Sequence, residues 1–208
     1  MRVVSTNIAK PQILEWKGKK QRTGIFKEPA ASIYLEKQQV RGDEISNRKV
    51  HGGIFKACYL FSADHYDHWK ELYPNLKWNY GMLGENITVE GLDETSIHVG
   101  DIYRLGSALI QVTQPREPCS TFGAKIGDQG ILKKFIEHGR PGTYVRILEE
   151  GEVKVDDELI LVEKANDSLS TADLFRLIFD KDQNKEHLDR ALKNEAIPLE
   201  KRLRIPRS

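Results

Sequence analysis

Cysteine is scarce in this sequence, and long hydrophobic runs are missing from it. Cys58 and Cys119 are the only two cysteines among 208 residues, and neither belongs to a CxxC pair, so a disulfide framework is excluded. No stretch approaches the roughly 20 apolar residues of a membrane-spanning helix. The N-terminus, MRVVSTNIAK, lacks the apolar segment of a secretory signal. These absences predict a cytoplasmic protein with reduced thiols and no membrane partner.

An excess of charge of one sign is also lacking. The 32 Lys and Arg residues nearly balance the 31 Asp and Glu residues, which leaves a formal net charge of +1. A chain without a strong overall field gives no reason to expect a nucleic-acid partner. The GxGxxG, GxxxxGK[ST], GxSxG and HExxH signatures are missing as well, so nucleotide-binding, hydrolase and zinc-protease functions lose their main support.

Short apolar runs typical of β-strands fill the first two-thirds of the chain, with few helices between them. Gly106 in YRLGSALIQV and Gly151 in ILEEGEVKV are expected at the tips of two hairpins. Helices are expected at residues 62–74 and 128–139, where apolar residues recur at helical spacing. The pattern predicts a mainly β fold, an antiparallel barrel or sandwich with a few interspersed helices.

The pattern changes after residue 164. Three short amphipathic helices follow, and the first begins with a capping box formed by Ser170 and Asp173. These helices carry too few apolar residues to fold alone, so they must pack on the β domain or on a second copy of the chain. We therefore expect a β-barrel domain at 1–164 and a three-helix extension at 165–208, with a homodimer as one way to cover the extension.

The last helix carries a local basic cluster. The stretch EKRLRIPRS contains Lys201, Arg202, Arg204 and Arg207 against a single Glu200. Such a cluster suits the docking of an acidic electron-transfer partner. A solvated, frayed terminus explains the same residues equally well.

The first candidate site is the stretch NRKVHGGIFKA. It places Lys49, His51 and Lys56 around the paired glycines Gly52 and Gly53. Paired glycines let a ligand approach the backbone, and the cations and the imidazole suit a phosphate or another oxyanion. A solvated hairpin with incidental basic residues explains the pattern equally well.

The second candidate site is the stretch GMLGENITVEG. Gly81 and Gly84 indicate a constrained loop, in which Glu85 and Asn86 are candidates to orient a ligand. By itself this stretch is explained more simply as a turn that enters a strand.

The third candidate site is QPREPCS. Pro115 and Pro118 restrict the backbone, so the groups between them are held in fixed directions. Arg116 precedes Cys119 by three residues, and a nearby cation lowers the pKa of a thiol and favours the thiolate, which is the nucleophile and the soft-metal ligand. We therefore expect a reactive or ligating thiol at Cys119. Cys58, in the apolar run ACYLF, is expected to be an inert core residue.

Taken together, KVHGG, GEN and VGDIYRLGSALIQVTQPREPC, in this order, resemble the MOSC domain family, and the helical tail resembles the extension of its YiiM-type bacterial members. The resemblance implies a MOSC-type β-barrel that binds the pyranopterin molybdenum cofactor, with Cys119 as the metal ligand. His51 would hydrogen-bond the cofactor or move protons. The expected cofactor-binding set is Lys49, His51, Gly52, Gly53, Lys56, Glu85, Asn86, Arg116 and Cys119.

The resemblance further implies the reduction of N-hydroxylated compounds, notably N-hydroxylated purine and pyrimidine analogues. The sequence has no iron–sulfur or haem motif, so a partner reductase must deliver the electrons. One alternative is a non-catalytic carrier of the cofactor, or of sulfur as a Cys119 persulfide. A cysteine hydrolase using Cys119 and His51 is less favoured, because Pro118 has no N–H to offer to an oxyanion hole.

Overall fold

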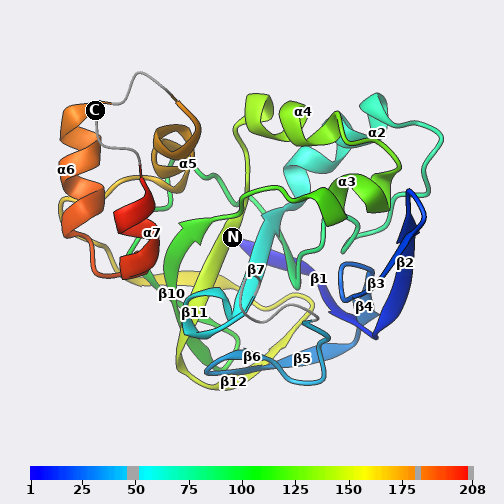
Figure 1. Ribbon diagram of the computed structural model, residues 1–208. Helices are drawn as coiled ribbons and strands as arrows, with labels where there is room; N and C mark the ends of the chain where they lie inside the picture. Colours follow the sequence, from blue (N-terminus) through cyan, green and yellow to red (C-terminus); the bar gives the residue numbers. More distant parts are fainter. Residues whose placement is uncertain (46–51, 181–183, 206–208) are drawn as a thin grey trace.

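The computed structural model describes residues 1–45, 52–180 and 184–205. Strands dominate up to residue 163, and helices follow (Figure 1). In chain order the elements are β1 (Arg2–Ala9), β2 (Gln12–Trp16), β3 (Lys19–Thr23), β4 (Lys27–Ala30), β5 (Ser32–Glu36), β6 (Gln39–Val40), the 3₁₀ turn η1 (Ile54–Lys56), β7 (Cys58–Ser62), the 3₁₀ turn η2 (Ala63–His65), α2 (Tyr66–Leu72), β8 (Ile87–Glu90), β9 (Ile102–Leu105), β10 (Ala108–Pro115), α3 (Ser120–Ile126), α4 (Ile131–His138), β11 (Thr143–Glu149), β12 (Gly151–Lys154), β13 (Leu159–Glu163), α5 (Thr171–Phe179), α6 (Lys185–Lys193) and α7 (Leu199–Arg204).

The largest sheet has the strand order β13-β9-β10-β11-β7-β8-β1-β4, and all its pairs are antiparallel except β7 with β8. The end strand β13 approaches the start of β1, the strand next to the other end, since the N–H of Leu159 donates to the carbonyl of Met1 at 2.9 Å and an isolated bridge joins Arg2 to Glu158. Within the described ranges no continuous ladder closes the ring. The prediction of a mainly β fold with a few helices is confirmed, but the described residues form a large mixed sheet rather than a closed barrel.

Aliphatic side chains from this sheet and from the three-stranded sheet β12-β5-β6 fill the main core. Strands alternate between buried and accessible residues, as in β12, because successive side chains point to opposite faces. The buried cluster includes Leu35, Leu60, Val89, Leu105 and Ile110, each at most 1% exposed. Cys58 lies in this cluster at 1% exposure, as the sequence predicts.

One of the two expected hairpins forms and the other does not. Gly106 turns the chain between β9 and β10, where Leu105 pairs with Ala108. The second prediction was wrong, because β12 pairs with β5 in another sheet rather than with β11. Gly151 is not at a hairpin tip: a Cβ there would lie 2.5 Å from the backbone nitrogen of Ala108, so the glycine permits a close backbone approach.

Helices α2, α3 and α4 lie together beside the end of β7 (Figure 1). Their buried rings form a second cluster that includes Trp69, Phe122 and Phe135. The two expected helices are found, although the second begins at Ile131 rather than at residue 128. The sequence did not predict α3, which directly follows Cys119.

The three tail helices pack on the β domain. The hydroxyl of Ser170 accepts the N–H of Asp173 at 3.0 Å, which confirms the predicted cap of α5. Val99 shares a buried cluster with tail residues such as Leu174 and Ala191. No helix in the described part of the chain is long and apolar enough to cross a membrane. The division at residue 164 and the homodimer stay predictions.

Candidate functional site

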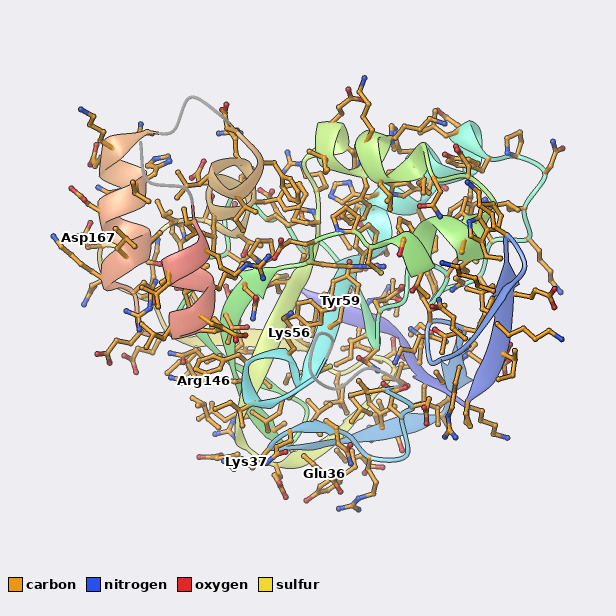
Figure 2. All side chains as sticks on the ribbon, in the orientation of Figure 1. Glu36, Lys37, Lys56, Tyr59, Arg146 and Asp167 are labelled. Carbon is orange, nitrogen blue, oxygen red and sulfur yellow. The ribbon has the colours of Figure 1, made fainter. Side chains whose placement is uncertain are left out.

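A cleft of about 370 Å³ brings together segments that lie far apart in the sequence. Figure 2 shows two of its residues, Lys56 and Tyr59, near the centre of the molecule where β7 begins. Its walls come from the end of β3 and the loop after it, β4, the loop after β6, the region from η1 into β7, the loop before β8, the loop from β10 into α3, and β11. The lining residues are Gln21, Arg22, Thr23, Gly24, Ile25, Lys27, Asp43, Glu44, Ile45, Lys56, Ala57, Tyr59, Gly84, Asn86, Arg116, Glu117, Cys119, Thr121 and Tyr144.

Cys119 lies in the cleft wall at the start of α3. It has an extended backbone (φ −126°, ψ 163°), and its carbonyl accepts the N–H groups of Phe122 at 2.9 Å and Gly123 at 3.3 Å. The thiol is therefore on a fixed cap position and is only partly buried. Cys58 differs, because full burial raises the pKa of its thiol well above the ordinary range. The structure thus places one accessible thiol in the cleft, where the sequence expects it.

Arg116 is a buried cation in the same wall, 5% exposed. Its guanidinium carbon lies 5.1 Å from the ring of Tyr59 and 4.7 Å from that of Phe122, and it donates a hydrogen bond to the carbonyl of Leu83. No carboxylate in the described part of the chain forms an ion pair with it. A permanent charge that is buried without a counterion favours the binding of an anion.

Lys56 forms another part of this wall, at the end of η1. Its ammonium lies 5.8 Å from the centre of the Tyr144 ring. Burial lowers the pKa of Lys56, and the carboxylates of Glu117 and Glu200 oppose that shift. Lys56 and Arg116, which the sequence assigned to the binding of an anion, therefore do line one cleft.

Asn86 lines the cleft beside an ion pair that the sequence did not reveal. Its amide donates to Asp43 at 3.0 Å, and its side-chain oxygen accepts the N–H of Tyr59 at 3.2 Å. Asp43 also pairs with Lys27, and both side chains are at most 8% exposed. Asp43 belongs to the stretch RGD, which looks like an ordinary turn. No local pattern links it to Lys27.

The other predicted residues are placed differently. Glu85 does not line the cleft: it is fully buried and accepts the N–H of Gly81 at 2.7 Å, the hydroxyl of Thr88 at 2.8 Å and the hydroxyl of Tyr66. It therefore braces the loop that carries Asn86. Gly52 and Gly53 precede η1, outside the lining, with Gly53 at φ 97°. The predicted residues Lys49 and His51 lie outside the described residues.

Residues 47–160 match the MOSC domain family. The chain belongs to this family. It is 37% identical to the uncharacterized protein YflK of Bacillus subtilis, over 94% of this chain and 88% of that protein. It is 32% identical to the protein YiiM of Escherichia coli, over 73% and 70% of the two chains. The crystal structure of YiiM from Geobacillus stearothermophilus superposes with a TM-score of 0.79 at 31% identity, covering 97% and 98%.

MOSC domains are associated in general with the molybdenum cofactor, and the cleft residues fit such a group. Cys119 offers a sulfur ligand for the metal, because thiolate is the side-chain ligand that a thiophilic metal prefers. The buried guanidinium of Arg116, which has no ion-pair partner among the described residues, suits the anionic part. This MOSC domain therefore presents both kinds of ligand within one cleft.

Proposed function

We propose that this MOSC protein binds the pyranopterin molybdenum cofactor in the cleft and reduces N-hydroxylated compounds, including N-hydroxylated base analogues, with electrons from a partner reductase. The observation that carries the proposal is the buried guanidinium of Arg116, which pairs with no carboxylate of the described ranges, in the same wall as the partly exposed thiol of Cys119. Either group alone is compatible with a purely structural role. Together they match a cofactor with an anionic end and a thiophilic metal.

Each cleft residue has a distinct role in this proposal. Cys119 would ligate the metal, while Arg116 and Lys56 would bind the anionic part of the cofactor through charge-assisted hydrogen bonds. Asn86, whose amide donates to Asp43 and to the carbonyl of Asn7, would hold the wall of the cleft beside the ligand. The bound cofactor supplies two-electron redox chemistry. The roles expected for Lys49 and His51 stay predictions.

The overall reaction consumes two electrons and two protons per N–OH group, and it yields the amine and one water molecule. The chain has two cysteines, one of them buried, so it cannot provide four cysteine ligands for an iron–sulfur cluster. In this proposal a separate reductase therefore supplies the electrons. The cytoplasmic location expected from the sequence is part of the same proposal.

Metal and pterin analysis tests the proposal. The protein is produced in a molybdenum-replete host that makes the cofactor, and both components are measured on the sample that is assayed. We expect stoichiometric molybdenum and pterin, with reduction of an N-hydroxylated base by a chemical electron donor. Stoichiometric cofactor without turnover would instead support the carrier function. A sample without molybdenum that carries sulfane sulfur on Cys119 would support a persulfide carrier.

A further inference from the structure

The tail reaches the loop at residues 116–119 (the thiol loop) through an ion pair between a buried lysine and a partly exposed glutamate. Lys201 of α7 lies 84 positions from Glu117 in the sequence, yet its ammonium is 2.5 Å from a carboxylate oxygen of that residue. Lys201 is only 8% exposed, although the sequence suggested that it belongs to a solvent-facing basic cluster. Glu117 lies between Arg116 and Pro118, two residues before Cys119.

The ion pair matters for stability because the Lys201 ammonium group is buried. An ammonium group is stable away from water only when a partner offsets its lost hydration. Glu117 is the only carboxylate within ion-pair distance of Lys201 in the described part of the chain. The ion pair therefore links α7 directly to the loop that carries Cys119.

The other contacts of α7 make it a rigid support. Ile205, at its end, is 3% exposed in the tail cluster, and Arg202 donates to the carbonyl of Leu192 in α6 at 3.0 Å. Figure 1 shows α7 on the side of the extension that faces the strands. The helix is thus fixed to the tail on one side and to the thiol loop on the other.

The thiol loop is held from two directions. Arg116 points inward and donates to the carbonyl of Leu83, while Glu117 points to the tail and pairs with Lys201. Pro118 has no backbone N–H, so it cannot add a backbone donor bond of its own. The side-chain contacts of Arg116 and Glu117 therefore add to the strand pairing at Pro115 and the cap hydrogen bonds at Cys119.

We propose that Lys201 is a positioning residue of the cleft, which holds the loop at residues 116–119, and with it the Cys119 thiol, through its ion pair with Glu117. The three-helix extension is then part of the site rather than an appended module. The inference rests on the proposed function only in taking Cys119 as the functional thiol.

Hydrogen exchange of the cofactor-free, full-length protein tests the inference. Exchange is followed by mass spectrometry in peptides that cover residues 116–123, where the N–H groups of Phe122 and Gly123 bond to Cys119. We expect Lys201→Glu and Glu117→Lys each to speed exchange there by about tenfold, because each puts like charges together in a partly buried place. The reversed pair, E117K with K201E, should return to within about twofold of the wild-type rate.

Three controls distinguish a local effect at residues 116–123 from a general effect of charge or of unfolding. Lys193→Glu makes the same charge change at an exposed position of α6 and should leave residues 116–123 unchanged. A peptide that covers residues 102–112 reports global unfolding. If the charge reversals unfold this core, Lys201→Met with and without Glu117→Gln replaces them, and the single variant should exchange faster than the double variant.

Unchanged exchange in the single variants, or a reversed pair as fast as the singles, would overturn the inference. Because the protein carries no cofactor in this experiment, the result does not depend on molybdenum binding. In cofactor-loaded protein, the pterin should dissociate faster from K201E and regain its wild-type rate in the reversed pair. Absence of the cofactor from the wild-type protein would refute the proposed function and leave the exchange result standing.

Discussion

At the scale of single residues, the two cysteine thiols differ because one is buried in the core and the other lies in the cleft wall. Cys58 lies in the aliphatic core, where burial raises the pKa of its thiol and keeps it neutral. Cys119 lies on a cap position in a cleft, beside a buried guanidinium. Only the second thiol can reach a ligand.

Cys119→Ser should lose bound molybdenum and at least about 100-fold in reduction of an N-hydroxylated substrate, because an alcohol is a far poorer ligand for a soft metal than a thiolate. Metal analysis and steady-state assays of the same samples check this. Cys58→Ser is the matched control and should keep its molybdenum, with any loss confined to thermal stability. Equal behaviour of the two variants would rule out Cys119 as the ligand.

Arg116→Met should separate charge from packing, because methionine keeps apolar contact with the rings of Tyr59 and Phe122. The lost charge-assisted contact should cost about 1.5–3 kcal/mol, or roughly one to two orders of magnitude in cofactor affinity. Pterin that remains after gel filtration measures the effect. Arg104→Met, at a solvent-exposed ion pair, is the control. Full pterin retention in R116M would show that the guanidinium is only structural.

At the scale of elements, a histidine cluster joins α2 to the end of α4. The ring of His138 stacks on that of His68, with centroids 4.1 Å apart, and meets the ring of His65 edge-on at 5.2 Å. His65 in turn lies 3.3 Å from a carboxylate oxygen of Glu94. In the described part of the chain, no set of three or more ligand-type side chains is arranged to hold a metal. The ring contacts of His138 with His68 and Trp69 pack the end of α4 against α2.

Acid should loosen this packing. Burial, with the nearby His68, His65 and Arg140, lowers the pKa of His138 to about 4. The unfolded chain, with an ordinary pKa near 6.5, binds this proton first, so stability should fall as the pH drops from about 6.5 toward 4. The loss is on the order of 1–2 kcal/mol after allowance for solvent screening.

Urea denaturation at pH 7 and pH 5 measures this loss. His138→Gln should lose less stability between the two pH values than the wild-type protein does. His187→Gln, which alters a histidine on α6 away from the cluster, should behave like the wild-type protein. A wild-type loss that H138Q leaves unchanged would assign the acid sensitivity to other groups.

At the scale of the whole molecule, the extension and the β domain share buried surface. The ring of Phe175 from α5 packs edge-on against Phe135 of α4, with centroids 6.3 Å apart. Val99 of the β domain lies in the tail cluster, and the N–H of Thr171 donates to the carbonyl of Ile97 at 2.9 Å. These contacts explain how helices with few apolar residues stay folded.

Truncation after Lys164 should therefore destabilise the β domain as well as remove the tail. It exposes Val99 and the aromatic cluster around Phe135, which should cost at least about 3–5 kcal/mol. It also leaves Glu117 without Lys201. We expect a midpoint of thermal unfolding at least about 10 °C lower, together with loss of the cofactor. Calorimetry and metal analysis check both.

Leu203→Ala is the control for this truncation, because Leu203 is 62% exposed and should contribute little to stability. A truncated protein that melts like the wild type and keeps its molybdenum would show that the extension is an independent module. In that case its role would have to lie in contacts with a partner.

The sequence by itself predicted many of the strands and helices, although it did not predict α3 or the pairing of β12. Apolar alternation predicted the strands, Ser170 predicted the start of α5, and Gly106 predicted a tight turn, because each signal acts within a few neighbouring residues. The contrast between Cys58 and Cys119 followed from flanking residues for the same reason. Lys56 was singled out because cations beside paired glycines suit an oxyanion, and Arg116 because it stands three residues before Cys119 between two prolines.

Only the tertiary structure decided which residues meet. The pair of Lys27 with Asp43 spans 16 positions, and that of Lys201 with Glu117 spans 84, so no local pattern marks either one. Gly151 looked like a hairpin tip until the chain path placed β12 against β5. Glu85 was a candidate to orient a ligand, but in the structure it is buried and its hydrogen bonds stabilise its own loop. Local propensities fix short segments, whereas burial and pairing of charge depend on the whole path of the chain.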